Sequence, residues 1–250
     1  MIALLDGAAC PLRALRMLRR APRLWRYVTG PILVNLVVGA VLYALLLVAV
    51  LRVLDPLVAD LTGPAALLGA ALRLLVVVAL LVIVGFLLVR FGVVLGAPWY
   101  SRLSEQLEAM MLGSPPPMQA LTLGGVARDL GRALGFEARK LSLVAAVGLG
   151  LLVANLLPLA GQAFAAAGGL ALGALVTCLD FFDGPLERRG WSFRAKLGYI
   201  RRTLPASAGF GLVCVAFLAV PLLNLLAIPL CVAAGTLFVC ERRSLLGPRA

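Results

Sequence analysis

One stretch near the N-terminus constrains this chain more than any other: an uncharged run from Tyr27 to Leu51 that directly follows a basic segment. At about 1.5 Å of rise per helical residue, the part from Pro31 to Leu51 reaches roughly 30 Å, the hydrocarbon thickness of a bilayer. The run therefore predicts a membrane-spanning helix with a positively charged foot. It is longer than the apolar region of a signal peptide, so we expect an anchor rather than a cleaved leader.

The basic foot, residues 13–26, has the spacing of an amphipathic helix. Apolar residues recur among six arginines, which predicts a helix that lies on the membrane surface; they are Leu12, Leu15, Leu18 and Trp25. The arginines are Arg13, Arg16, Arg19, Arg20, Arg23 and Arg26.

The junction between the foot and the apolar run has the residues of a helix start. Pro31 suits a first helical turn, where its missing N–H would have no partner, and Thr29 or Gly30 then becomes the N-cap. The first backbone N–H groups would point toward Arg26, and a helix N-terminus beside a guanidinium can bind an anion. The residues alone do not decide between an anion-binding site and a basic segment that only keeps the N-terminus on the cytoplasmic side. They favour the latter, because basic flanks are common there.

Composition places the whole chain in the membrane. Hydrophobic residues make up 62% of the 250 positions, charged residues only 14%, and the mean hydropathy is +1.05. A soluble domain is about half apolar and a quarter charged. The net charge of +12 is spread between the apolar runs without aromatic interleaving, so we expect contact with anionic lipids and no nucleic-acid partner.

Catalytic and metal chemistry find little support in the sequence. There is no histidine, which removes histidine triads, metal sites and proton relays. The five cysteines form no C-x-x-C pair and suit apolar packing. Glu105 and Glu108 can do acid–base work in principle, but an interfacial ion pair with Arg102 or a neighbouring chain is favoured. We expect no enzyme activity, no metal and no cofactor.

The remaining polarity pattern predicts an all-α integral membrane protein that forms a single membrane domain over residues 1–250. Its expected segments are a first spanning helix at 31–54, a second at 73–97, cytoplasmic amphipathic helices at 98–140, a first hairpin at 141–179, a basic cytoplasmic segment at 180–202 and a second hairpin at 203–240.

The two hairpins are expected to enter the membrane only part-way, because each uncharged stretch is too short for two full spans and a turn. Interruptions at corresponding places, Asn155 with Pro158 and Pro221 with Asn224, point to a substrate path or simply to the hairpin turns. The amides of Asn155, Gln162 and Asn224 suit either the lining of an anion path or hydrogen bonds between helices.

Charge also predicts the orientation. Segments 90–140 and 180–202 each carry six basic residues, whereas the 52–73 loop has two arginines against two aspartates. The 52–73 loop is therefore expected outside and both termini in the cytoplasm. Asp180 and Asp183 are expected to form salt bridges with the basic 188–202 segment rather than a cytoplasmic mouth.

Four segments in order resemble a known family. They are "PRLWRYVTGPILVN" (22–35), "APWYSRLSEQL" (97–107) continuing to "LGSPPP", "LLPLAGQ" (156–162), and "LDFFDGPLERRGWSF" (179–193) with "PLLNLLAIPLCVAAGTL" (221–237). Together they resemble the bacterial CysZ sulfate permeases, within the etoposide-induced-protein domain superfamily, from about Pro22 to Glu241.

The resemblance implies a multi-pass protein of the bacterial inner membrane that admits sulfate for cysteine biosynthesis without an ATPase motif, with sulfite as a second candidate anion. It implies two long transmembrane helices, two hemi-penetrating hairpins and a homo-oligomer. The family's sulfate-associated arginines map to Arg26, with Trp25 where a second arginine is common and Arg23 where a glycine is expected.

Two functions remain in competition at this point. One is a channel-like sulfate permease, in which Arg23, Arg26, Thr29 and Gly30 bind the anion. The other is a non-transporting membrane scaffold or lipid-interacting protein of the same superfamily. An integral membrane enzyme is disfavoured. The arginine foot separates the first two, because only a permease needs Arg26 for flux.

Overall fold

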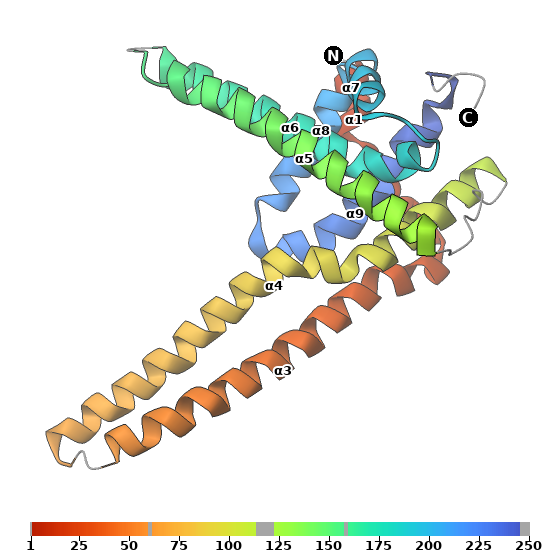
Figure 1. Ribbon diagram of the computed structural model, residues 1–250. Helices are drawn as coiled ribbons and strands as arrows, with labels where there is room; N and C mark the ends of the chain where they lie inside the picture. Colours follow the sequence, from red (N-terminus) through yellow and green to blue (C-terminus); the bar gives the residue numbers. More distant parts are fainter. Residues whose placement is uncertain (1, 60–61, 114–122, 158–159, 246–250) are drawn as a thin grey trace. The chain divides into compact units, whose positions relative to one another are not determined.

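The computed structural model describes residues 2–59, 62–113, 123–157 and 160–245, and every regular element in these ranges is a helix (Figure 1). The elements are α1 (Ile2–Ala8), α2 (Cys10–Arg20), η1 (Pro22–Leu24), α3 (Trp25–Val58), α4 (Pro64–Leu112), α5 (Leu123–Ala154), α6 (Gly161–Glu187), α7 (Phe193–Arg202), α8 (Ala206–Leu218), α9 (Pro221–Glu241) and η2 (Arg243–Leu245). The all-α prediction is confirmed for this part of the chain.

The chain divides into two compact units. One is Arg26–Trp99, which we name the long helix pair because it consists of α3 and the greater part of α4. The other joins Met1–Trp25 to Tyr100–Ala250 and is named the packed unit. The long helix pair is thus an insertion between the first two helices of the packed unit and the rest of it.

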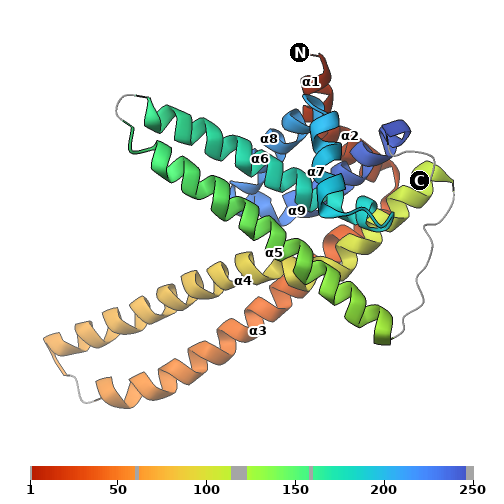
Figure 2. The ribbon, with the colours of Figure 1, turned by 45° about the horizontal axis from the view of Figure 1, so that its top comes forward.

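In the long helix pair, α3 and α4 lie side by side and antiparallel (Figures 1 and 2). The Tyr43 hydroxyl donates to the Val77 carbonyl at 3.3 Å, and Arg73 pairs with Asp55 at 3.0 Å near the connection between the helices. Pro22–Val58 and Ala65–Leu87 are long and apolar enough to cross a membrane, and only 11% of each apolar window is buried. Their side chains mostly face outward, as expected where lipid surrounds them.

Both long helices extend beyond their predicted limits. We expected the first to begin at Pro31, but α3 begins at Trp25 and contains Pro31. We expected a boundary at 97, but α4 continues through Pro98 to Leu112. A proline removes one N–H and strains one turn, and packing on both sides can sustain the helix through it.

The packed unit is built around stacked aromatic rings from three helices. Phe182 of α6 lies 4.8 Å from Phe210 of α8 and 4.7 Å from Phe238 of α9, measured between ring centroids. All three side chains are fully buried. Glycines bring the backbones close: a Cβ at Gly211 would lie 2.4 Å from the Ala174 carbonyl oxygen, and one at Gly235 would lie 2.4 Å from that of Phe181.

The packed unit contains two helical hairpins (Figure 2). The first pairs α5 with α6, and the second pairs α8 with α9. Their arms differ in length from our expectation, since α5 already begins at Leu123 and α6 ends at Glu187. Helix α6 is itself long and apolar enough to cross a membrane. The 13 residues of α8 reach only about 20 Å, short of a bilayer. Part-way entry of the hairpins stays a prediction.

The basic foot is not one continuous surface helix. It divides at Ala21 between α2 and η1, and the apolar face of α2, including Ala14 and Leu18, is buried where α2 packs on α9. Protein therefore covers Ala14 and Leu18, whereas Leu12 and Trp25 are exposed, and contact of the foot with the membrane surface stays a prediction. The amphipathic spacing has the same signature in both cases, since a helix packed on a core and a helix lying on lipid both need one apolar stripe.

Candidate functional site

Arg26, the first predicted anion ligand, lies in the opening turn of α3 with an exposed side chain. Its Nη2 donates to the Tyr27 hydroxyl at 2.8 Å, and its guanidinium lies 4.7 Å from the centre of the Tyr27 ring. Tyr27 is itself buried. The ring therefore orients the guanidinium at the start of α3. The backbone there is already hydrogen-bonded, because η1 runs directly into α3 and the Trp25 N–H donates to the Pro22 carbonyl.

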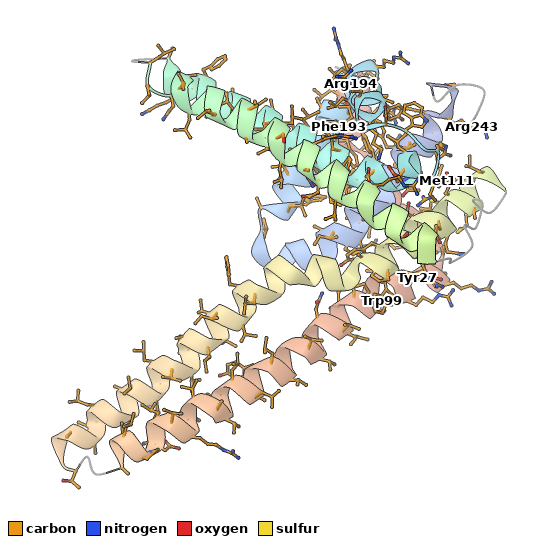
Figure 3. All side chains as sticks on the ribbon, in the orientation of Figure 1. Tyr27, Trp99, Met111, Phe193, Arg194 and Arg243 are labelled. Carbon is orange, nitrogen blue, oxygen red and sulfur yellow. The ribbon has the colours of Figure 1, made fainter. Side chains whose placement is uncertain are left out.

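Thr29 and Gly30 do not cap the helix. They are its fifth and sixth residues, so the prediction of an N-cap at either position is wrong. Gly30 has another role, because a Cβ there would lie 2.7 Å from Nε1 of Trp99. Figure 3 shows Trp99 and Tyr27 at the same end of the long helix pair. Gly30 thus provides the space in which the indole packs against α3.

Arg26, Thr29 and Gly30 nevertheless share a face of α3, because residues three and four apart are neighbours on a helix. Arg23 lies in η1, in the packed unit, and its side chain is exposed. Anion binding by these four residues stays a prediction.

A second cationic group, which the sequence analysis missed, is buried in the packed unit. Glu108 is 3% exposed and accepts hydrogen bonds from Nε and Nη2 of Arg188 at 2.9 and 2.7 Å. Arg189 reaches the other carboxylate oxygen at 2.5 Å. We name Glu108, Arg188 and Arg189 the buried arginine cluster. Our expectation that Glu108 pairs at the surface with Arg102 or a neighbouring chain is wrong.

Two hydroxyl groups extend the buried arginine cluster. Nη2 of Arg188 donates to Ser104 at 2.7 Å, and the Ser104 hydroxyl lies 2.7 Å from that of Thr236 on α9. Two guanidinium groups face one carboxylate, so the cluster carries one excess positive charge in a place with little water. A sequence signal was available: Ser104 and Glu108 are four residues apart and fall on the stripe that Leu103 and Leu107 define.

A third group of charges joins α5, α6 and α7. Lys196 donates to Asp183 at 2.6 Å and also pairs with Glu187. This confirms the predicted bridge between Asp183 and the basic 188–202 segment. Asp180 bonds instead to Lys140 at 2.7 Å. Burial alone would lower the pKa of the Lys140 ammonium, but its hydrogen bonds to Asp180 and Glu137 raise that pKa above its usual value.

The predicted pore amides are not all brought together. Asn155 and Gln162 lie at the turn of the α5–α6 hairpin, and both side chains are exposed. Their neighbours Leu156 and Leu157 are exposed too, which makes the hairpin tip apolar around two amides. Asn224 lies in the first turn of α9, and its side chain is outside the described part of the structure.

No group of three or more histidine, cysteine, aspartate or glutamate side chains able to hold a metal ion occurs among the described residues. All five cysteines are buried and reduced, as apolar packing residues would be.

Known proteins place the chain in a family. Residues 10–229 match the family described as "Sulfate transporter CysZ/Etoposide-induced protein 2.4". A protein named sulfate transporter CysZ from Pseudomonas aeruginosa is 30% identical over 220 residues, 87% of each chain. Its namesake from Salmonella paratyphi A is 26% identical over 215 residues, 86% of this chain and 84% of that protein.

Other relatives match over a shorter region. The sulfate transporter CysZ of Pseudomonas syringae pv. tomato is 32% identical over 153 residues, which is 60% of this chain and 58% of that protein. That of Pseudomonas fluorescens is 30% identical over 152 residues, 59% of that protein. The chain thus spans less than two thirds of these two relatives. Since the family match covers 220 of the 250 residues, this all-helical membrane protein belongs to the CysZ/etoposide-induced protein 2.4 family.

Proposed function

We propose that this protein is a channel-like sulfate permease of the bacterial inner membrane that supplies sulfate for cysteine biosynthesis. The observation that carries the proposal is the family match over residues 10–229, together with relatives that bear the name sulfate transporter. The helices long and apolar enough to cross a membrane are consistent with it. We place the N- and C-termini in the cytoplasm, because segments rich in arginine and lysine generally stay on the cytoplasmic side of a membrane.

The chemistry of sulfate explains which groups such a protein needs. A divalent oxyanion is very costly to move into hydrocarbon unless charged donors replace its water. Guanidinium groups supply paired donors in the geometry of an oxyanion, and the end of a helix adds oriented N–H groups. Arg26 satisfies the first condition, since it is exposed in the first turn of α3 and is oriented by Tyr27. We therefore assign it the first contact with sulfate, with Thr29 and Gly30 on the same face and Arg23 nearby in sequence.

The path itself requires more than the long helix pair, because two helices cannot enclose water. We propose that the hairpins, entering part-way, and several copies of the chain together form it. Asn155, Gln162 and Asn224 then line the path at the hairpin turns. The buried arginine cluster provides excess positive charge inside the packed unit. It attracts an anion more strongly there than exposed arginines would, because little water screens the charge.

Radiolabelled sulfate uptake into liposomes that contain the purified protein tests this proposal. The wild type is expected to take up sulfate, and sulfite is expected to compete. Arg26→Gln should reduce the uptake about tenfold, the loss expected for one charged hydrogen-bonding partner. Arg73→Gln is the matched control, because Arg73 is also an exposed arginine of the long helix pair but is paired with Asp55. Uptake equal to that of empty liposomes, from correctly folded oligomers, would rule out the permease.

A second function has some support from α2. Arg16, Arg19 and Arg20 are exposed on this helix, opposite the face that packs on α9. A row of exposed arginines suits anionic lipid headgroups. A non-transporting scaffold or lipid-interacting protein would retain binding to vesicles that contain phosphatidylglycerol while showing no sulfate uptake.

A further inference from the structure

A cavity of about 400 Å³ lies inside the packed unit, between the first half of α5 and the segment that joins α6 to α7. Figure 3 labels Phe193 and Arg194 at the start of α7, where this segment ends. None of the groups assigned to sulfate above lines the cavity.

The cavity has a net positive lining. Among the described residues that line it, the charged ones are Arg132, Arg139 and Lys196 against Glu187, three positive charges and one negative. Lys196 is already held by Asp183 and Glu187. Nε of Arg132 lies 3.7 Å from Glu187, and its side chain is 44% exposed. Lys196 and Arg132 thus both have carboxylate partners, so the capacity to bind an anion rests first on Arg139, with the 44% exposed Arg132 as the second cation.

The two arginines are placed as a pair. They are seven residues apart on α5, two turns along one face, with Gly135 between them on that face. A Cβ at Gly135 would meet nothing within 4 Å, and the same holds at Gly131. Two guanidinium groups thus flank a stretch of bare helix, where a ligand can approach the backbone.

Aromatic rings form the other wall of the cavity. Phe136, Trp191 and Phe193 all line it, and Phe136 packs edge-to-face on Phe193 at 5.7 Å between centroids. Nζ of Lys196 lies 4.8 Å from the centre of the Phe136 ring, which fixes that ring in place. An inorganic oxyanion such as sulfate or phosphate has no apolar surface that could pack against these rings. The volume is in the range of pockets that hold small organic molecules, roughly 300–1,000 Å³.

We propose that this cavity binds an organic phosphate or sulfate ester. Arg132 and Arg139 hold the oxyanion group over Gly135, and the organic part lies against Trp191 and Phe193. The ester comes either from a soluble small molecule or from a phospholipid headgroup, and both share the chemistry that the arginines recognise. The proposal goes beyond sulfate permeation and does not depend on it.

Isothermal titration calorimetry on the full-length protein in a neutral detergent tests the proposal with three probes. Adenosine monophosphate represents a soluble ester with a ring, dihexanoyl-phosphatidylglycerol represents a lipid headgroup, and inorganic phosphate represents the oxyanion alone. We expect one of the two esters to bind more tightly than inorganic phosphate. Tighter binding of adenosine monophosphate assigns a soluble ligand, and tighter binding of the lipid assigns a headgroup.

Matched variants locate the binding. Arg139→Gln should weaken it about tenfold or more, because one charged hydrogen-bonding partner is lost. Gly135→Leu should abolish it by filling the space between the arginines. The controls are Arg201→Gln, an exposed arginine on the last turn of α7, and Gly148→Leu, another position on α5 where a Cβ meets nothing within 4 Å. Both controls should bind like the wild type.

Three results would overturn the proposal: no heat from any probe, an ester that binds no better than inorganic phosphate, or binding unchanged in both Arg139→Gln and Gly135→Leu. If Gly135→Leu fails to fold, Arg132→Gln replaces it and should weaken binding as Arg139→Gln does. Sulfate uptake is measured on the same preparations. Binding with no uptake leaves the cavity assigned and the permease excluded, and uptake with no binding does the reverse.

Discussion

The long helix pair and the aromatic core of the packed unit use apolar side chains in opposite ways. In the long helix pair, Leu36, Leu45 and Leu74 are each 65% exposed. In the packed unit, Phe182 and Phe238 are at most 1% exposed. The first arrangement is stable only in a solvent that accepts hydrocarbon, whereas the second supplies its own apolar surroundings.

Charges follow the same division. The long helix pair has the ion pair between Arg73 and Asp55, whose side chains are 46% and 55% exposed. In the packed unit, Glu108 is almost fully enclosed by Arg188 and Arg189. A buried ion-pair cluster thus lies in the interior of the packed unit, whereas the ion pair of the long helix pair is exposed near one end. Substitutions with similar chemistry should consequently have very different effects in the two units.

Truncation of the central aromatic ring should have the largest effect. Phe182→Ala removes a ring that contacts both Phe210 and Phe238, and should cost about 3–5 kcal/mol of unfolding free energy. Leu45→Ala in the long helix pair should change the unfolding free energy by less than about 0.5 kcal/mol, because that side chain makes few packing contacts within the chain. Thermal denaturation in a mild detergent measures both. Equal effects would contradict the division between the units.

Loss of the carboxylate in the buried arginine cluster should come next. Glu108→Gln leaves Arg188 and Arg189 close together without an anion, and should cost about 2–3 kcal/mol. Glu105→Gln, three residues earlier on α4, is the control and should be near neutral. The same denaturation assay applies. A neutral Glu108→Gln would mean that water already solvates the cluster.

Lowering the pH should reduce the stability of the packed unit by a smaller amount. Burial alone would raise the pKa of Asp6, but Arg13 and Arg242 lower it below its usual value. A lowered pKa in the folded state stabilises the fold above about pH 4, and this contribution is lost as the pH falls through the folded value. Denaturation at pH 6 and at pH 3 should show it in the wild type. Asp6→Asn should lack this part of the pH dependence, and an unchanged dependence would remove Asp6 from the account.

The smallest effect is expected at the exposed pair of the long helix pair. Arg73→Gln should change stability by less than about 0.5 kcal/mol, because both partners are exposed and solvent screens them. Denaturation at low and high salt should give nearly the same small difference. A change above 1 kcal/mol would show that this pair is shielded, as a lipid headgroup region could do.

Hydropathy alone predicted the elements well and their limits poorly. The expected spans at 31–54 and 73–97 lie inside α3 and α4, and the break near Asn155 is a hairpin turn. The continuity through Pro31 and Pro98 was not predicted, because a proline is a local penalty that packing elsewhere in the helix can outweigh.

The sequence predicted the candidate site only where its residues are neighbours in the chain. Arg26 and its place at the start of a helix follow from neighbouring residues. The pairing of Glu108 with Arg188 joins positions 80 apart, and no periodicity within either segment specifies it. The same holds for the cavity, whose walls come from α5 and from the segment after α6.

The two ends of the chain meet in the packed unit. Asp6 of α1 pairs with Arg242 just after α9, and Arg13 of α2 pairs with Glu241 at 3.2 Å. Ribosomes make α1 and α2 first and α9 last, so the first helices must wait for the last before their apolar faces are covered. The long helix pair can enter the bilayer during that interval. The packed unit therefore cannot be completed before the long helix pair has been synthesised, and a chain that stops before α9 would leave the apolar face of α2 without its partner helix.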